Sequence, residues 1–445
     1  ASVVDGALRD PASETRLQRA MEKRLKRGLK HFSWFIYRFT TPVMQRLFAQ
    51  PRNVLQIEQA VISMLAGDVF DNRAVLRRLR LFRLLYAFNA VQLAPQAFRG
   101  WLRRRHAAGR QSMSRQLASP TLPPVRLSVD YVAADRPENL LAGENTLAVF
   151  GFGNDAPHSD DPRYLRVPLQ PHGASPFEVW RSNGPIRSGR DGDIAWSTDG
   201  QLLFGAIELD EHEIGIEAAA ERIYAQLIAF QARSATPKLL RIWNYLDAIT
   251  LGEGDTERYR QFCVGRARGM GDFDTSNLPA ATAIGRCDDQ RTLQVYWLAA
   301  CEAGTPVENP RQVSAYRYPR EYGRQSPSFA RAMLPPADGH MPLLLSGTAS
   351  VVGHATQHVG ELLAQIEETF TNFDALLGAA RQRAPWLPAQ FGPGTRLKVY
   401  VRDRDDLPLV KAALDQRFGD RVPRVLLHAA ICRRELSMEI DGVHG

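Results

Sequence analysis

Three side chains near the end of the chain have the types and spacing for acid–base and anion-binding chemistry: Arg424, Cys432 and Glu439. They lie in or beside apolar, β-prone segments, and a charged turn at 433–435 separates those segments. A buried, isolated charge is costly, so such residues are normally paired or take part in a reaction. The alternative is an edge hairpin whose charges are solvated. The spacing favours a site.

The same C-terminal stretch resembles the closing strands of the Rid (YjgF-like) fold. In that fold an arginine binds a substrate carboxylate and a glutamate lies across the same cleft. A cysteine seven residues before the glutamate is similar to the chorismatase family, the chorismate-hydrolysing relatives of the fold. Six further segments resemble this family in the expected order: RIWNYL (241–246), ERYRQFCVGRA (257–267), LPAATAIG (278–285), SAYRYP (314–319), SPSFARA (326–332) and LLLSGTAS (343–350).

This resemblance covers about residues 122–442 and implies cleavage of the enolpyruvyl ether of chorismate to pyruvate and 3-hydroxybenzoate, with 4-hydroxybenzoate as a further product in some members. It also implies a place in aromatic secondary metabolism, such as aryl-polyene pigment or quinone biosynthesis. The catalytic positions it implies are Glu439 and Cys432. The substrate-binding positions it implies are Arg424, Arg266, Tyr316, Arg331 and Gly347.

The residue types suit that reaction. An enol ether is cleaved by protonation of its methylene carbon, which needs a carboxylic acid that stays neutral near pH 7, and burial of Glu439 would raise its pKa in that direction. Arginines bind the two carboxylates of a dianion better than lysines do. In the family, a small residue and a cysteine accompany 3-hydroxybenzoate formation, and this chain has Gly347 and Cys432. A thiolate-capable group beside the ring could assist an arene-oxide-like intermediate.

Other interpretations stay open. Each arginine could instead form a surface ion pair, and Cys432 could be a packed core thiol. A Rid-like fold could also hydrolyse imines, or it could sense an aromatic or keto acid without turnover. His354, His358 and Glu361 have metal-like spacing, but they lie at a strand-to-helix junction, so we expect no metal site. We expect no cofactor.

The predicted fold is α+β, with Rid-like or chorismate-mutase-like βαβ units whose helices pack on one face of mixed sheets. Residues 397–440 read as strand, helix, strand, turn, strand. An all-helical segment is expected over 1–112 and a linker over 113–124, with Met113 as a possible native start. The remainder is expected to divide into an N-terminal subdomain, 125–235, and a C-terminal catalytic subdomain, 236–445.

Charge separates the first segment from the rest of the chain. Residues 1–112 hold 21 Lys and Arg against 7 Asp and Glu, a net of +14, whereas the remaining residues have a net of −6. Basic and aromatic residues together could bind a membrane surface or nucleic acid, but a solvated face is the commoner reason for such a pattern, so no nucleic-acid partner is expected. Within the segment, YRFTTPVM (37–44) and SMLAGD (63–68) resemble the C-terminal helices of flavin-dependent tryptophan halogenases. No GxGxxG is present, so no flavin activity is inferred.

Composition indicates the class of protein, its redox environment and whether it spans a membrane. The chain has 445 residues, of which 44% are hydrophobic and 23% charged, as is typical of a soluble globular protein. Its four cysteines have no CxxC or Cys/His spacing, which argues against a zinc site or a disulfide framework and fits a reducing cytoplasm. No apolar run is long enough for a membrane span. We expect a cytoplasmic monomer.

Overall fold

The computed structural model describes residues 126–271, 274–336 and 339–445, together with Arg19, Glu22 and Tyr86. The chain divides into two units, Ala1–Thr121 and Leu122–Gly445. The predicted helical segment 1–112, its halogenase-like segments and the linker 113–124 lie almost wholly outside the described residues. All that follows concerns the second unit.

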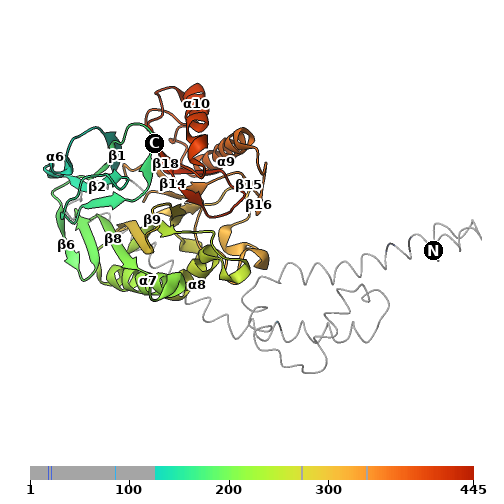
Figure 1. Cartoon of the computed structure of the whole chain (residues 1–445), viewed down its shortest axis with the longest axis horizontal. Coiled ribbons are helices and arrows are strands. Elements are labelled where there is room, and N and C mark those ends of the chain that lie inside the picture. The colour runs from blue at the N-terminus through green and yellow to red at the C-terminus, as the bar shows by residue number, and fades with distance from the viewer. Residues whose placement is uncertain (1–18, 20–21, 23–85, 87–125, 272–273, 337–338) are drawn as a thin grey trace, which may run out of the picture. The chain divides into compact units, whose positions relative to one another are not determined.

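Three sheets make up this unit (Figure 1). The small sheet has the strand order β1 (Ser128–Val132), β5 (Phe177–Arg181), β2 (Thr146–Phe152) and β3 (Tyr164–Val167). The sheet centred on β9 has the order β19 (Ala430–Ile431), β10 (Ala280–Arg286), β9 (Lys238–Asp247), β11 (Thr292–Ala300), β8 (Leu202–Asp210), β7 (Ile194–Thr198) and β6 (Arg187–Asp191). We call it the β9 sheet.

The third sheet, the β20 sheet, has the order β12 (Thr305–Val307), β13 (Ala332–Leu334), β14 (Leu343–Thr348), β20 (Met438–His444), β17 (Arg396–Val401), β18 (Arg424–His428) and β4 (Gln170–Pro171). Parallel and antiparallel pairs occur in all three sheets. A short pair, β15 (Val351–Val352) and β16 (Ala355–Thr356), stands apart. The sheets are therefore mixed, as predicted.

The longer helices cover the outer faces of the two large sheets (Figure 1). Helix α7 (Gly215–Arg233) buries residues at steps of three and four, including Ile216, Ile223 and Leu227, and packs with α8 (Arg258–Met270) under the β9 sheet. Helices α9 (Leu362–Arg381) and α10 (Leu407–Phe418) do the same for the β20 sheet. The remaining short helices are α6 (Pro137–Leu141), η3 (Gly254–Thr256), η4 (Thr275–Asn277), η5 (Ala315–Arg317), η6 (Arg320–Tyr322) and η7 (Arg404–Asp406).

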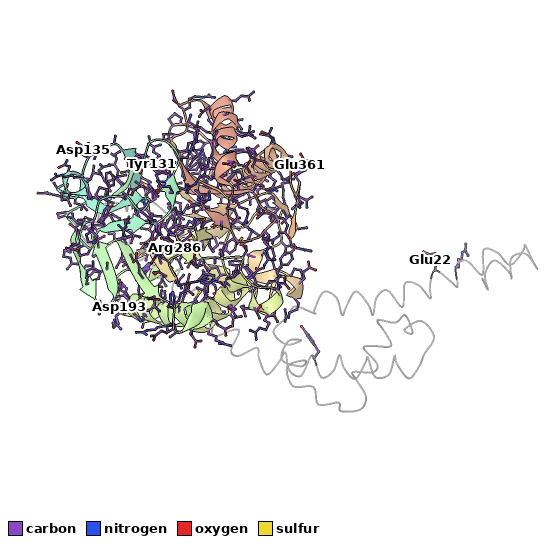
Figure 2. The ribbon with its side chains drawn as sticks, in the orientation of Figure 1. Glu22, Tyr131, Asp135, Asp193, Arg286 and Glu361 are labelled. Carbon is purple, nitrogen blue, oxygen red and sulfur yellow. The ribbon has the colours of Figure 1, made fainter. Side chains whose placement is uncertain are left out.

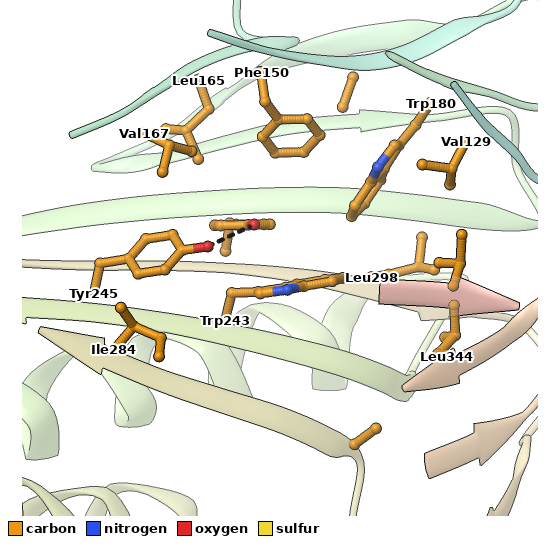
Figure 3. Close-up of a cluster of buried hydrophobic side chains, with 14 of the residues drawn as sticks. Val129, Phe150, Leu165, Val167, Trp180, Trp243, Tyr245, Ile284, Leu298 and Leu344 are labelled. Carbon is orange, nitrogen blue, oxygen red and sulfur yellow. Dashed lines mark hydrogen bonds between the residues drawn. The ribbon is translucent and has the colours of Figure 1, made fainter. Parts of the chain in front are cut away.

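The inner faces of the three sheets meet in a central core, part of which is drawn in Figure 3. Its aromatic centre includes Trp243, whose ring stacks on Tyr296 with the centroids 4.7 Å apart and the planes 9° from parallel. Trp180 and Phe150 of the small sheet pack against the same group. Tyr131, labelled in Figure 2, donates a hydrogen bond of 2.9 Å to the carbonyl of Leu397 and so ties the small sheet to the β20 sheet.

These observations confirm the mixed α+β class. The predicted division between 125–235 and 236–445 falls inside the β9 sheet, between α7 and β9, so one sheet spans both proposed subdomains. Among the described residues, no helix has the length and apolar character needed to cross a membrane.

The two large sheets meet where β10 lies against β14. The register between β14 and β20 shifts between Leu345 and Thr348, so Ser346 and Gly347 leave the ladder. The Ser346 hydroxyl instead bonds the Ala281 amide (3.0 Å) and the Ala330 carbonyl (2.5 Å). The bulge therefore joins the two sheets and opens β14 toward β10.

Candidate active site

A cavity of about 320 Å³ lies at this junction, and that volume suits a small-molecule ligand. Its walls come from α8, β10 and β14, from the segment 312–331 that crosses above them, and from the turn at 432–436 before β20. The residues that carry the argument below are Arg266, Thr282, Arg331, Gly347, Cys432, Arg433 and Glu439.

Glu439 is the second residue of β20 and pairs in register with Tyr400 on β17, which places it in a central strand. It is 6% exposed. Burial raises the pKa of its carboxyl to about 8, and the negative charge of Asp441 adds to the rise, while Arg241, Arg331 and Arg433 oppose it. A group with that pKa is mostly a neutral acid at pH 7. Glu439 can therefore donate a proton in a cavity where an ordinary glutamate would be ionised.

Gly347 leaves the space that this carboxyl group needs. A Cβ atom at position 347 would overlap Oε1 of Glu439, so no other residue type fits here without moving the acid. The Gly347 amide, released from the ladder by the bulge, donates to the Thr282 hydroxyl at 3.0 Å. The close approach of the Glu439 carboxyl, rather than an unusual backbone angle, is the reason for glycine.

Cys432 lies beside the acid, with its Sγ 4.0 Å from Oε2 of Glu439. Burial raises the pKa of the thiol well above its usual range, and the nearby Glu439 raises it further. Both effects favour the neutral thiol over the thiolate that the sequence suggested, because a thiolate would be desolvated in this position.

Two buried arginines give the cavity its positive charge. Arg266 on α8 donates from Nη1 to the Ser328 carbonyl at 2.6 Å, and its Nε and Nη2 have no hydrogen-bond partner among the described residues. Arg331 donates from Nη2 to the Val313 carbonyl (3.0 Å) and the Tyr318 hydroxyl (2.7 Å), and its Nε has no such partner. Buried donors of this kind are normally paired, so both side chains can donate hydrogen bonds to an anionic ligand.

A third arginine, Arg433, comes from the turn before β20. Its guanidinium lies over the rings of Tyr322 and Tyr318, 4.3 Å and 5.3 Å from their centroids, and donates to the His354 carbonyl at 2.8 Å. Cation–π stacking on two rings fixes it against the crossing segment. The turn thus contributes a positioned cation to the cavity.

Behind the cavity, a buried ion pair supports Glu439. Asp441 accepts hydrogen bonds at Oδ2 from Arg241 (3.1 Å), Trp243 (3.0 Å) and Tyr400 (3.0 Å). Both Arg241 and Asp441 are fully buried. Since side chains alternate along a strand, Glu439 and Asp441 share one face of β20. A fixed negative charge therefore stands two residues from the acid.

The sequence and fold of this chain are similar to those of known proteins. Residues 178–299 match the sequence model described as the N-terminal domain of FkbO/Hyg5-like chorismatases. A chorismatase of Streptomyces hygroscopicus is 35% identical over 273 residues, which cover 60% of this chain and 78% of that protein. The chain belongs to the chorismatase family.

Two further relatives agree with this assignment to the chorismatase family. A 3-hydroxybenzoate synthase of Streptomyces hygroscopicus is 32% identical over 316 residues, or 68% of this chain and 92% of that protein. A crystal structure of a chorismatase matches with a TM-score of 0.64 and 30% identity, over 73% of this chain and all of that one. The resemblance to the chorismatase family noted in the sequence is confirmed.

Among the positions that the sequence suggested for a chorismatase site, five meet in the cavity: Glu439, Cys432, Arg266, Arg331 and Gly347. Tyr316 is not among the cavity-lining residues. Its ring packs beside the α7–α8 core, and Arg317 lies over it at 5.6 Å.

Arg424 does not reach the cavity either. It begins β18, and its guanidinium bonds the Asp415 carboxylate and the carbonyls of Gly419 (3.0 Å) and Val422 (2.8 Å) at the end of α10. The reason is topological: β18 pairs with β17, whereas β19, which leads to Cys432, pairs with β10 in the other large sheet. The stretch is therefore not a simple hairpin.

Sequence reasoning missed Arg433, Thr282 and the Arg241–Asp441 pair. The sequence shows Arg433 only as part of a charged turn, and the rings that it contacts, Tyr318 and Tyr322, lie in and beside a family-like segment. The second acid, Asp441, two residues after Glu439 in an otherwise apolar strand, was the available signal for a buried partner. The histidines with metal-like spacing bond different groups, His354 with Glu321 and Tyr322, and His358 with Glu368.

Proposed function

We propose that this protein cleaves chorismate to pyruvate and 3-hydroxybenzoate. The observation that carries the proposal is the buried Glu439 carboxyl, with its pKa raised to about 8, in a cavity that also holds Arg266 and Arg331. The relatives named chorismatase and 3-hydroxybenzoate synthase support the substrate and the product.

Glu439 is the acid. It transfers its proton to the methylene carbon of the enolpyruvyl group, which makes the carbon next to the ether oxygen electrophilic and weakens the bond between that oxygen and the ring. The transfer leaves a carboxylate, and Arg241, Arg331 and Arg433, whose charges already favour that form, stabilise it. The same positive charges bind the dianionic substrate, with Arg266 and Arg331 offering free N–H donors to its carboxylates.

The cavity also suits the aromatic product. Pyruvate and 3-hydroxybenzoate together contain all the atoms of chorismate, so this outcome consumes no water, whereas the dihydroxy diene acid requires one. Gly347 leaves room for the Glu439 carboxyl at the cavity wall, and the Cys432 thiol stands next to that carboxyl. We propose that Cys432 acts on the ring chemistry rather than on the cleavage of the ether.

Incubation of the full chain with chorismate tests the proposal. Pyruvate is followed with a coupled lactate dehydrogenase assay, and the aromatic products are separated by chromatography. Stoichiometric pyruvate and 3-hydroxybenzoate support the assignment, and the ratio to any 4-hydroxybenzoate is measured in the same run. Tight binding of chorismate without turnover would instead support a sensor. Hydrolysis of imines derived from amino acids would support a Rid-type hydrolase.

Three further expectations about the fold, the assembly and the metabolic role accompany this proposal. The unit β17–α10–β18 joins two parallel strands through a helix, which supports a Rid-like βαβ arrangement at the end of the chain. The enzyme is proposed to act as a cytoplasmic monomer, without cofactor, metal or nucleic acid. It is proposed to supply an aromatic acid to secondary metabolism.

A further inference from the structure

The neighbours of Thr282 determine which hydrogen bonds its hydroxyl group accepts and which it must donate. A hydroxyl group has one proton to donate and two lone pairs to accept with. Its Oγ accepts from Nη2 of Arg241 at 2.5 Å and from the Gly347 amide at 3.0 Å. Neither partner can accept a proton in return, because a guanidinium and a backbone amide offer only N–H groups. Both lone pairs are therefore used, and the O–H must donate elsewhere.

No acceptor for this proton is found among the residues that the structure describes. Thr282 is 3% exposed and lines the cavity, so the cavity is the place from which a partner can reach this hydroxyl. A buried donor without an acceptor is unfavourable, and buried donors in native proteins are nearly always paired with protein, ordered water or a ligand. Because Thr282 lines the cavity, a ligand bound there can provide the acceptor.

We propose that Thr282 is a substrate-contacting residue whose hydroxyl donates to the carboxylate of the enolpyruvyl group. This rests on the proposed function, since it takes chorismate as the ligand. The buried Arg241–Asp441 pair then has a further role: it holds the guanidinium that forces the Thr282 proton toward the cavity. The donor is set before the substrate arrives, which reduces the cost of ordering on binding.

The choice of carboxylate follows from the position of the acid. The Glu439 carboxyl overlaps the point where a Cβ at Gly347 would lie, and Cγ2 of Thr282 is 3.4 Å from that same point. Glu439 and Thr282 thus flank one end of the cavity. The carbon that Glu439 protonates is bonded to the carbon that carries the enolpyruvyl carboxylate, whereas the ring carboxylate lies several bonds away. The nearer anion is the acceptor.

Thr282→Val tests this, because it keeps the shape and removes the hydroxyl. We expect the KM for chorismate to rise about tenfold or more, while the inhibition constant of 3-hydroxybenzoate, which has no enolpyruvyl carboxylate, stays within about threefold. Thr282→Ser should restore both values nearly to those of the wild type. Thr348→Val is the matched control: that hydroxyl is equally buried, donates to the Ser346 carbonyl at 3.1 Å and does not line the cavity.

Two results would overturn the inference. One is an unchanged KM for chorismate in Thr282→Val, and the other is an equal loss of chorismate and 3-hydroxybenzoate binding, which would indicate that Gly347 or Arg241 has moved. If the valine variant does not fold, Thr282→Cys, a much weaker donor, must show the same selective loss. A wild-type chain that releases no pyruvate from chorismate would contradict the proposed function instead.

Discussion

The carboxyl group of Glu439 occupies the space that a side chain at position 347 would fill. The strand carrying the acid and the bulged strand beside it therefore constrain each other, and the first prediction follows directly. Gly347→Ala should lower kcat about a hundredfold, because the added methyl group pushes the acid out of line. Gly378→Ala, in α9 with open space around it, is the control and should keep full activity. Retention of more than half the wild-type kcat in Gly347→Ala would show that the acid can shift without loss.

Glu439→Gln should abolish pyruvate release but leave chorismate binding within about tenfold, since an amide fills the site and cannot protonate carbon. Turnover is measured by the coupled assay and binding by calorimetry. Glu435→Gln, an exposed carboxylate at the rim of the cavity, should behave as wild type. A glutamine variant with more than about a tenth of the wild-type rate would remove Glu439 from the role of acid.

Activity should require the protonated form of Glu439. Since the pKa of this group is raised to about 8, kcat/KM should hold at neutral pH and fall about tenfold per pH unit above that value. Asp441→Asn removes a negative charge that raises this pKa, so the falling limb should move to lower pH, and asparagine can still accept from the same donors. A pH profile of each variant checks this, with the exposed Asp420→Asn as control. A limb that stays in place, or moves to higher pH, contradicts the coupling.

Cys432→Ala should leave pyruvate release largely intact and divert the ring product toward the non-aromatic dihydroxy acid. Ether cleavage depends on Glu439, whereas formation of the 3-hydroxy ring needs a further group at the ring face. The loss of this small packing contact should weaken substrate binding by only on the order of 1 kcal/mol. Chromatography of the products decides the question, with Cys263→Ala, a buried thiol of the cavity wall, as control. An unchanged yield of 3-hydroxybenzoate would make Cys432 a packing residue.

The fragment 113–445 should be folded and as active as the full chain. At the linker the sequence changes from a basic, helical pattern to a mildly acidic one with short strands. Every segment that resembles the chorismatase family lies after the linker. Thermal unfolding and kcat/KM of both forms, prepared in parallel, provide the test. An insoluble or inactive fragment beside an active full chain would make the basic segment part of the enzyme.

Much of the site could be predicted because its residues lie in long, specific segments. Glu439, Cys432 and Gly347 were found from the family-like pattern, and burial of Glu439 followed from its apolar neighbours. Arg424 was misplaced because spacing along the chain does not reveal that β18 and β19 join different sheets. Thr282 lies in the family-like segment 278–285, but nothing in that segment distinguishes its hydroxyl, whose partners Arg241 and Gly347 are 41 and 65 residues away.

The position of β20 has a consequence for the order of events during synthesis. This strand lies between β14 and β17 although it follows both in the chain, so the β20 sheet keeps a gap at its centre until residues 438–444 have been made. Until then β14 and β17 have unpaired edges, and unpaired edges of this kind are prone to pair with other chains and to aggregate. Because Glu439 lies on the strand that fills the gap, neither the acid nor the complete sheet can be in place before these last residues have been made.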